Sequence, residues 1–377
     1  MSIPSPSRAI VDLGAYARNL AYVRTLIPKE CALMPIVKAD AYGLGAVPIA
    51  KKAIECGAAM LGVASVSEAV ELREAGIMHR ILVMVQPSDD ALPAAVEYEL
   101  RLMISETSCA ERVGELARRA NRVVPIHCKI DTGMGRQGLN ADTAVSQMLY
   151  LTRVSHVDLE GVATHFPIAD SARDPFTANQ LRTFRHVLRQ LEKEGIPYEM
   201  VHAANSAAIV NHPASVFDMV RPGLMTYGVW PTDTPPATSP LSQVLRWESE
   251  VVLVKDLEKG VTIGYGRTYT ADEKMRIALV PVGYADGFRY SLSNRGHVLI
   301  RGKRCPVRGS VSMDQIVVDV TQVAGVTLGD PVTIIGRDGS LTITVEDVAK
   351  QAETIPYEIL TGIGRRVQRV YVDTPHA

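Results

Sequence analysis

The feature that most constrains the fold of this chain is an alternation of short apolar segments with amphipathic stretches over roughly its first 220 residues. The apolar segments are rich in Val, Ile, Leu and Met and have the length of strands buried on both faces. Eight strands alternating with helices predict a (β/α)8 TIM barrel, with a doubly wound open sheet as the alternative. Helices are expected at Ser67–Ala75, Glu111–Ala120 and Phe176–Gly195. The expected strands are Leu33–Lys38, Met60–Ser65, Ile81–Val85, Leu102–Ser105, Pro125–Ile130, Leu159–His165, Met200–Asn205 and Met219–Arg221.

Polar side chains stand at the carboxyl ends of most of these strands. That end is where (β/α)8 barrels build their active sites, so the placement favours the barrel over the open sheet. The residues concerned are Lys38, Ser65, Ser105, Lys129, His165, Asn205 and Arg221.

A proline- and threonine-rich segment, Pro231–Pro240, indicates a linker between two domains. After it, short apolar segments at close spacing predict a mainly β domain with one helix, Val345–Gln351. We therefore expect a barrel domain over residues 1–235 and a C-terminal β domain over residues 236–377. The strands expected in the second domain are Trp247–Lys255, Arg276–Val282, His297–Ile300, Ile316–Val320 and Pro331–Ile335.

The composition argues against several classes of function. With 40 Lys and Arg against 41 Asp and Glu, the chain lacks the basic footprint of a protein that binds nucleic acid or an anionic membrane. No apolar run approaches the ~20 residues of a membrane-spanning helix, and the start of the chain lacks a hydrophobic signal core. The five cysteines are scattered without a CxxC pair, so we expect no disulfide framework and no metal site. A cytoplasmic location is expected.

The most informative stretch is Val37–Gly45, in which Lys38 closes an apolar segment and a glycine-containing turn follows. A lysine at this place would be desolvated, which favours the neutral amine that a Schiff base requires. The alternative is a lysine that merely reaches solvent from the end of a strand.

This stretch resembles the cofactor-lysine motif of the alanine racemase family, the barrel-type class of pyridoxal 5′-phosphate (PLP) enzymes. Other segments resemble that family in the same order over nearly the whole chain, which makes the resemblance specific. It implies a PLP-dependent homodimer with shared active sites that interconverts L-alanine and D-alanine and supplies D-alanine for peptidoglycan. The matching segments are Lys129–Gly138, Thr164–Phe166, His202–Ala207, Arg221–Gly223, Gly264–Tyr269, Gly283–Gly287, Ser312–Gln315 and Pro356–Ile359.

The resemblance assigns the groups that move protons. Lys38 would bind PLP and act as one base, while Tyr265, supplied by the other subunit of the dimer, would act as the second. His165 would hydrogen-bond this tyrosine. Racemisation needs such a pair, because one group removes the α-proton from one face and the other returns a proton to the opposite face.

The resemblance also assigns contacts to cofactor and substrate. Arg221 would face the pyridine nitrogen of PLP and keep it unprotonated, since a guanidinium only donates hydrogen bonds. His202 would orient Arg221. For Ser206, among the phosphate contacts, a plain helix N-cap is the alternative. The implied phosphate contacts are Tyr42, Ser206, Gly223, Leu224 and Tyr357, and the implied substrate-binding residues are Arg136 for the carboxylate, Lys129 as a carbamylated support of Arg136, and Met313, Asp314 and Tyr284.

The chain departs from the family pattern at four positions, with Asp40 for asparagine, Leu44 for histidine, Ser310 for arginine and Ser312 for cysteine. These changes bear on substrate breadth and on the access path. The alternatives to an alanine racemase are a broader amino-acid racemase, a PLP-dependent decarboxylase and a PLP-carrying protein without catalysis. A decarboxylase needs no base opposite the lysine, and PLP-carrying proteins resemble the barrel alone.

Overall fold

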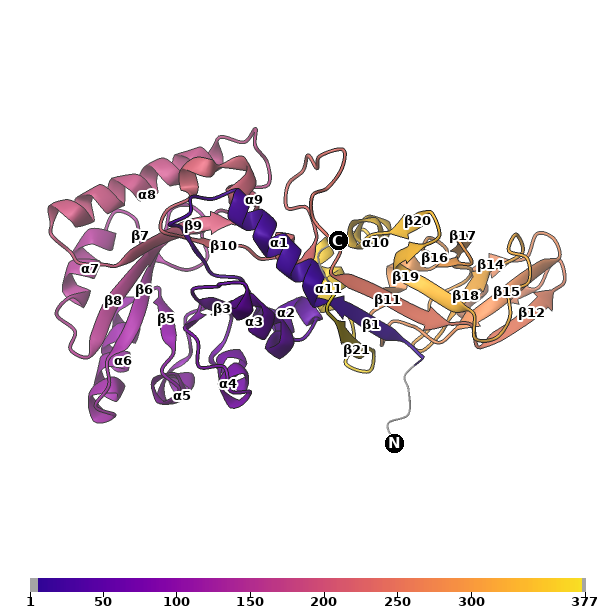
Figure 1. Ribbon diagram of the computed structural model, residues 1–377, viewed down its shortest axis with the longest axis horizontal. Coiled ribbons are helices and arrows are strands. Elements are labelled where there is room, and N and C mark those ends of the chain that lie inside the picture. Colours follow the sequence, from indigo (N-terminus) through magenta and orange to yellow (C-terminus); the bar gives the residue numbers. More distant parts are fainter. Residues whose placement is uncertain (1–5, 375–377) are drawn as a thin grey trace. The chain divides into compact units, whose positions relative to one another are not determined.

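The computed structural model describes residues 6–374, which divide into two compact units. One unit comprises Ala17–Ala41 and Ala46–Leu241. The other contains the described residues up to Tyr16, the short segment Tyr42–Gly45 and the chain from Ser242 onward. Figure 1 colours these segments along the chain and labels their elements. None of the described helices is long and apolar enough to cross a membrane.

The first unit is built on parallel strands in the order β2-β10-β9-β8-β6-β5-β4-β3. The two ends of this order are joined after β2, where Ile36 forms a parallel bridge with Gly62 and the Val37 N–H donates to the Gly62 carbonyl at 2.8 Å. The predicted (β/α)8 barrel is therefore confirmed, and the open sheet is not. Its strands are β2 (Ala32–Leu33), β3 (Leu61–Val63), β4 (Ile81–Val83), β5 (Arg101–Ile104), β6 (Val124–Asp131), β8 (Val157–Ala163), β9 (Met200–Asn205) and β10 (Met219–Arg221), with β7 (Leu139–Asn140) beside β6.

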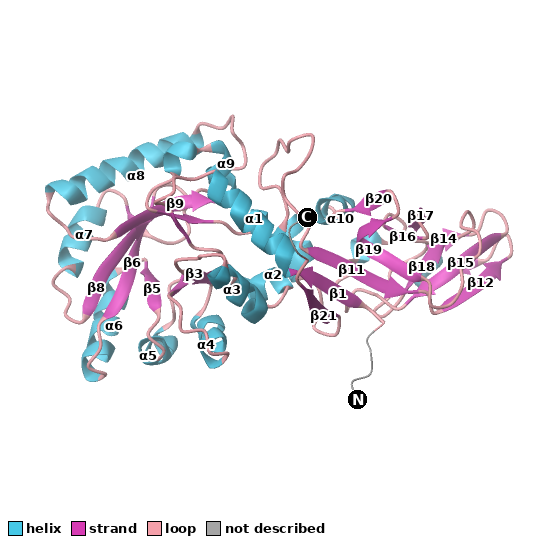
Figure 2. Ribbon diagram, in the orientation of Figure 1, coloured by secondary structure: helices cyan, strands magenta, loops and turns pink. Residues whose placement is uncertain are grey.

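Helices cover the outside of this curved sheet, as Figure 2 shows for α4 to α8. The helix expected at Ser67–Ala75 begins one residue earlier, because Ser65 and Glu68 form a reciprocal capping box. Met34, Met60, Leu82, Met103 and Met219 pack into one buried cluster, each from a different strand or from the residue next to one. The helices are α1 (Leu13–Thr25), α2 (Lys38–Gly43), α3 (Ala46–Glu55), α4 (Val66–Glu74), α5 (Leu92–Glu97), α6 (Thr107–Arg119), α7 (Ala144–Leu151), α8 (Phe176–Lys193) and α9 (Ser206–Asn211).

The prediction of a strand over Leu33–Lys38 is wrong in its second half. The strand β2 ends at Leu33, and Lys38 begins α2. Pro35 lacks the N–H that a continuous ladder would need. The residues after Lys38, Ala39 to Gly43, all have positive φ between 51° and 80°, so α2 is a left-handed turn. Four of them are not glycine, and each pays roughly 1 kcal/mol for this conformation.

The second unit is mainly β, as predicted. Its largest sheet has the order β17-β16-β19-β11-β1-β21, with β20 beside β19, and a three-stranded sheet has the order β12-β15-β18. The strands are β1 (Arg8–Asp12), β11 (Leu245–Glu250), β12 (Leu253–Leu257), β13 (Thr262–Ile263), β14 (Tyr269–Thr270), β15 (Met275–Val280), β16 (His297–Ile300), β17 (Lys303–Pro306), β18 (Ile316–Asp319), β19 (Pro331–Asp338), β20 (Leu341–Ile343) and β21 (Gln368–Val372), with helices α10 (Val345–Gln351) and α11 (Pro356–Thr361).

Two details of the second unit differ from the sequence expectations. The strand β1 pairs with β11 and β21, although its residues were expected in the barrel domain. The single strand expected at Trp247–Lys255 is two strands, β11 and β12, because the chain leaves one sheet at Glu250 and enters another at Leu253.

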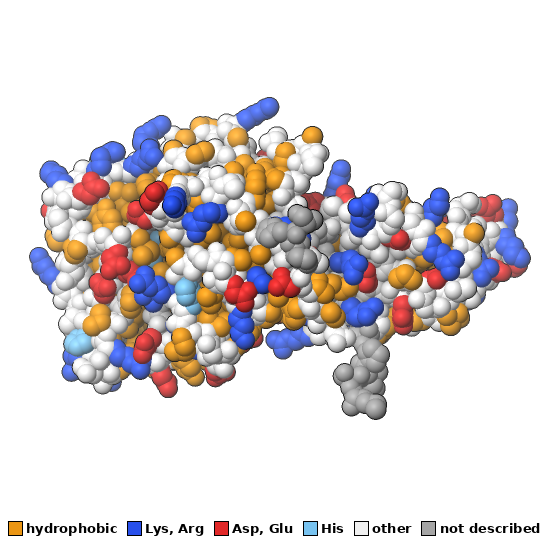
Figure 3. Space-filling view, in the orientation of Figure 1, with side chains coloured by type: hydrophobic (Ala, Val, Ile, Leu, Met, Phe, Trp, Pro, Cys, Tyr) orange, Lys and Arg blue, Asp and Glu red, His pale blue; other side chains and the backbone are white. Residues whose placement is uncertain are grey.

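On the face drawn in Figure 3, basic and acidic side chains are interspersed over both units, as the near-balance of charge in the sequence suggests.

Candidate active site

Lys38 belongs to the turn α2 and not to β2, but it comes two residues after the bridge between Ile36 and Gly62, so it still lies beyond the carboxyl end of this strand. Burial lowers the pKa of its amine, and the nearby Arg136 lowers it further, while Glu68 acts in the opposite direction. Both main causes favour the neutral amine. Such a group can act as a nucleophile towards an aldehyde or as a proton acceptor.

The left-handed turn after Lys38 is held by two carboxylates. The Ala39 N–H donates to Glu68 Oε1 at 2.7 Å, and the other oxygen of Glu68 accepts from the Ala64 N–H at 2.6 Å. Asp40 Oδ1 accepts from the Ala46 N–H at 2.7 Å, at the start of α3. Asp40, which replaces an asparagine of the family pattern, therefore ties the two ends of the turn together. Glu68 was not among the predicted site residues, although its place in an S-x-x-E capping box is visible in the sequence.

Arg221 ends β10, and its side chain is buried. Its terminal nitrogens donate to three carbonyls, those of Thr164, His202 and Ala203, at 2.7–2.9 Å. They also donate to Nδ1 of His202 at 2.9 Å and to Nδ1 of His165 at 3.1 Å. These five acceptors share the four terminal N–H groups, two on Nη1 and three on Nη2. Within the described residues the Nε–H has no protein acceptor, so it is available to a ligand atom that accepts one hydrogen bond.

The predicted pairing of His202 with Arg221 is present in this structure. Burial and the charge of Arg221 lower the pKa of His202 well below its usual value. Burial also lowers the pKa of Arg221, to about 10, which leaves the guanidinium protonated at neutral pH. The hydrogen bond therefore runs from a charged donor to a neutral imidazole.

His165 follows β8 and is likewise held neutral. Burial lowers its pKa well below the usual value, and Arg221 and Lys129 add to this effect. Because Arg221 donates to Nδ1, the neutral ring carries its proton on Nε2. His165 thus presents an Nε2–H donor.

Lys129 and Arg136 lie on β6 and on the loop that follows it. Burial lowers the pKa of Lys129 to about 8, with contributions from Arg221 and Arg136. Asp131 shapes the loop that carries Arg136, since its carboxylate accepts from the backbone N–H groups of Gly133, Met134 and Gly135 at 2.8–3.2 Å. Arg136 itself is exposed.

Ser206 opens α9, but it is not the N-cap, so that alternative is wrong. The N-cap is Asn205, whose side chain accepts from the Ala208 N–H at 2.9 Å. The Ser206 hydroxyl accepts instead from the Gly223 N–H at 2.9 Å and from the Met225 N–H at 3.4 Å. It links the loops after β9 and β10, with Leu224 beginning a 3₁₀ turn between these contacts.

The remaining predicted site residues belong to the second unit. Tyr42 is buried with its ring 5.8 Å from that of Tyr357 between centroids, and burial, followed by the proximity of Tyr357, raises its pKa. Tyr265 is 77% exposed and stands between two glycines, Gly264 and Gly266, both with φ of 69°. Only a residue without Cβ adopts that conformation at little cost.

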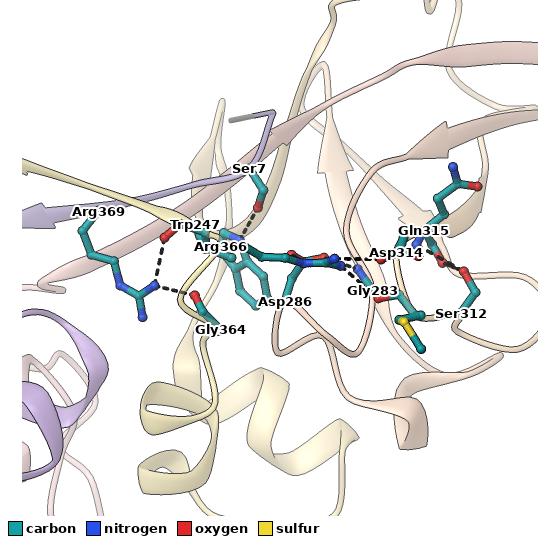
Figure 4. A network of polar contacts seen from close by, with 12 residues as sticks. Ser7, Trp247, Gly283, Asp286, Ser312, Asp314, Gln315, Gly364, Arg366 and Arg369 are labelled. Atoms are coloured by element: carbon teal, nitrogen blue, oxygen red, sulfur yellow. Dashed lines mark hydrogen bonds and ion pairs between the residues drawn. The ribbon is translucent and has the colours of Figure 1, made fainter. Parts of the chain in front are cut away.

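The exposed Tyr265 borders a surface pocket of about 740 Å³ in the second unit. Two of its lining residues, Met313 and Asp314, are held by Arg366, which was not among the predicted site residues (Figure 4). Arg366 pairs with Asp286 through Nε at 2.6 Å and with Asp314 through Nη1 at 2.8 Å, and Nη2 donates to the Met313 carbonyl at 3.2 Å. The pairing with Asp286 and then Asp314 raises the pKa of Arg366. The pocket is lined by Gly264, Tyr265, Leu279, Tyr284, Ser310, Ser312, Met313, Asp314, Gln315 and Val317.

The barrel residues fit the cofactor that the sequence resemblance implies. Lys38 offers an amine of lowered pKa, and Arg221 offers a single N–H to an acceptor such as a pyridine nitrogen. Lys129 and Arg136 add positive charge to the same region, as their effects on the pKa of His165 indicate. Such surroundings favour anionic groups, including a phosphate and a carboxylate.

Comparison with known proteins bears on the whole length of the chain. Residues 11–231 match the family model described as alanine racemase, N-terminal domain, and residues 244–371 match alanine racemase, C-terminal domain. The curated alanine racemase of Symbiobacterium thermophilum is 44% identical, with 97% of each chain covered. The structure of alanine racemase from D-cycloserine-producing Streptomyces lavendulae superposes with a TM-score of 0.92 at 38% identity, covering 99% of this chain and 98% of that one. That of Bartonella henselae alanine racemase with covalently bound pyridoxal phosphate gives 0.88 at 28% identity, covering 98% and 100%.

Proposed function

This chain belongs to the alanine racemase family, and we propose how its own residues carry out the PLP-dependent interconversion of L-alanine and D-alanine. Lys38 handles the α-proton on one face of the substrate, and Tyr265 of the partner subunit handles it on the other. The single observation that carries the proposal is that Lys38, with an amine of lowered pKa, lies in the same barrel unit as Arg221, whose Nε–H is left for a ligand.

The cofactor defines what the residues must do. When bound, PLP supplies an aldehyde for the amino group and an electron-accepting ring, which together acidify the α-proton of an amino acid. The amine of Lys38 then accepts or returns a proton at Nζ, a role that its lowered pKa supports. A second group on the opposite face is required for inversion, and we assign it to the phenol of Tyr265, which is exposed and available to the partner subunit's site.

Arg221 limits how far the ring accepts electrons. A guanidinium donates and does not accept, so its Nε–H would hydrogen-bond the ring nitrogen and leave it unprotonated. We expect this to favour return of the proton to the α-carbon over transamination. His165, with a proton on Nε2, could in turn donate to the phenolate of Tyr265 of the partner subunit and stabilise its ionised form.

Substrate binding rests on the positive groups near Lys38. Arg136 would bind the carboxylate, and Lys129 would support it as a carbamate, whose formation requires the neutral amine that a pKa of about 8 supplies. The residues Met313, Asp314 and Tyr284 of the partner subunit would complete the pocket. For the phosphate, Tyr42, Ser206, Gly223, Leu224 and Tyr357 are the proposed contacts. The match over the C-terminal domain model favours this racemase over a PLP carrier built from the barrel alone.

A homodimer with shared sites follows from this proposal, because Tyr265 would act across the subunit boundary. We also propose a cytoplasmic enzyme that supplies D-alanine for peptidoglycan. Dilution tests the dimer: the specific activity should fall as subunits dissociate, in step with the loss of the dimer in sedimentation. A monomer with full activity would contradict the shared site.

Trapping of the cofactor tests the role of Lys38. Borohydride reduction of the yellow holoenzyme, followed by peptide mapping, should place the PLP adduct on Lys38 and abolish racemisation of alanine. The matched control is Lys193→Ala, an exposed lysine at the end of α8, which should bind PLP and racemise alanine as the unmodified chain does. A wild-type protein that never binds PLP, or an adduct on another lysine, would refute the assignment.

A further inference from the structure

Arg221 is a buried cation whose hydrogen-bond acceptors include no carboxylate. Its side chain is 4% exposed, and its acceptors are three carbonyls and two imidazole nitrogens. A charge in this position is costly unless a compensating charge lies nearby. The nearest direct contacts of Arg221 therefore supply no counter-charge.

A continuous chain of buried side chains leads from Arg221 to a carboxylate. His202 accepts from Arg221 through Nδ1 at 2.9 Å, and its Nε2 lies 2.8 Å from Nδ1 of His127. Nε2 of His127 lies 2.9 Å from Oε2 of Glu160, and the Nε of Arg101 completes the chain at 2.8 Å from the same oxygen. The five residues come from β10, β9, β6, β8 and β5, neighbours in the barrel.

The direction of every hydrogen bond in this chain is fixed by its two ends. A guanidinium can only donate, so Nδ1 of His202 must accept and its proton must be on Nε2. That proton is donated to Nδ1 of His127, which in turn carries its own proton on Nε2 and donates it to Glu160. Burial lowers the pKa of His127, although Glu160 opposes this effect. Both imidazoles are thus neutral Nε2–H tautomers that point the same way.

Two backbone features make room for the chain. The pairing of β6 with β8 shifts register between Ile126 and His127, so that Leu159 and Gly161 are paired while Glu160 is left out as a bulge. Bulges redirect a side chain and occur next to active sites. A Cβ at Gly161 would lie 2.4 Å from Nδ1 of His127, so only glycine leaves space for that ring.

We propose that Glu160, whose carboxylate is shared with the Arg101 salt bridge, acts through His127 and His202 as the remote counter-charge that fixes the orientation of Arg221 towards the ring nitrogen of PLP. His127 and Glu160 are positioning residues, because they reach Arg221 only through His202. This inference rests on the proposed function for the identity of the ligand, but the hydrogen-bond chain itself does not depend on it. Aligned hydrogen bonds in a low-dielectric interior polarise one another, so a distant carboxylate strengthens the hydrogen bond between Arg221 and His202.

The first test reads the chain in the unmodified protein. Histidine ¹⁵N spectra of the holoenzyme should show His127 and His202 as neutral Nε2–H tautomers from about pH 6 to pH 8. A protonated ring, or a proton on Nδ1 of either, would overturn the proposal. This measurement needs no catalysis, so a chain that failed to racemise alanine would refute the proposed function and leave the tautomers readable.

The second test removes the charge and keeps the shape. In Glu160→Gln, we expect a changed ¹⁵N shift of the pyridine nitrogen in enzyme loaded with labelled PLP. The ratio of transamination to racemisation should rise about tenfold, the usual scale for loss of a partner that orients a ligand-binding group. Gly161→Ala, which displaces the His127 ring, should give the same two changes. His79→Gln, at a half-buried histidine of the barrel outside this hydrogen-bond chain, is the control and should change neither.

The outcomes separate a positioning role from a structural one. If Glu160→Gln binds PLP with an unchanged nitrogen shift and an unchanged product ratio, the remote counter-charge is refuted. If that variant fails to fold, Gly161→Ala and the tautomers of the unmodified enzyme still decide the matter. Lower activity with both readouts unchanged would indicate packing alone and would also refute the proposal.

Discussion

The buried amine of Lys129 should make the chain less stable at neutral pH than it would be without that amine. Lys129 is only 4% exposed, and burial, with Arg221 and Arg136 nearby, lowers its pKa to about 8 from 10.5. The perturbation is Lys129→Met, which keeps the aliphatic length and removes the charge. We expect the variant to be more stable than the parent chain in PLP-free, carbonate-free buffer.

The size and sign of the effect follow from proton linkage. A pKa of about 8 in the folded chain against 10.5 in the unfolded chain corresponds to roughly 3 kcal/mol. Below about pH 8 the amine is protonated in both states, and the full penalty applies to the folded chain. Between about pH 8 and pH 10.5 the unfolded state binds more protons, so the stability of the parent chain rises with pH. The advantage of Lys129→Met should therefore shrink over this interval.

The assay is urea unfolding of the parent chain and Lys129→Met at several pH values, followed by circular dichroism. Lys193→Met, at an exposed position on α8, should show no such pH-dependent difference from the parent chain. Adding bicarbonate near pH 8 should stabilise the parent chain and not the Lys129 variant, if the neutral amine forms a carbamate. An identical difference in stability at pH 7 and pH 10 would refute the reasoning.

Two further predictions concern groups that hold the catalytic residues. Glu68→Gln replaces, with an amide donor, one of the two carboxylate oxygens that accept from Ala39 and Ala64. We expect the turn that carries Lys38 to lose about 2 kcal/mol of stabilisation. The rate of racemisation should fall about thirtyfold, and PLP should bind more weakly. An unchanged rate would show that the left-handed turn needs no such support. In Arg366→Lys, a single ammonium replaces the guanidinium that bridges Asp286 and Asp314. We expect kcat/KM for alanine to fall about tenfold, with the absorbance of bound PLP unchanged. A normal kcat/KM would refute this role of Arg366.

The sequence predicted the barrel because each central strand is a separate apolar run, and it predicted the place of Lys38 because strand ends gather at one face. It did not predict that β1 joins the other unit, since that depends on pairing with residues more than 230 positions away along the chain. The left-handed turn after Lys38 was also hidden. Alanine and tyrosine rarely adopt positive φ, and the turn depends on contacts with Glu68 and Ala46.

Several polar residues of the site were missed for a related reason. His127 and Glu160 lie within apolar runs, and a buried carboxylate in such a run is itself a signal that a partner must exist. The identity of that partner depends on the bulge that leaves Glu160 out of register, which no local pattern indicates. Arg366 lies far along the chain from Asp286 and Asp314, so its role could be found only from the folded structure.

The central claim, that an amine and a phenol act on opposite faces of one α-carbon, is tested most directly by α-proton exchange in deuterated water with Tyr265→Phe. The variant keeps the aromatic ring and loses the phenol oxygen. We predict that this variant retains PLP, no longer racemises alanine, and exchanges the α-proton of one enantiomer of alanine but not of the other. The control is Tyr150→Phe, at an exposed tyrosine of the barrel, which should behave as the parent chain does. Exchange of both enantiomers at comparable rates by Tyr265→Phe would contradict the account.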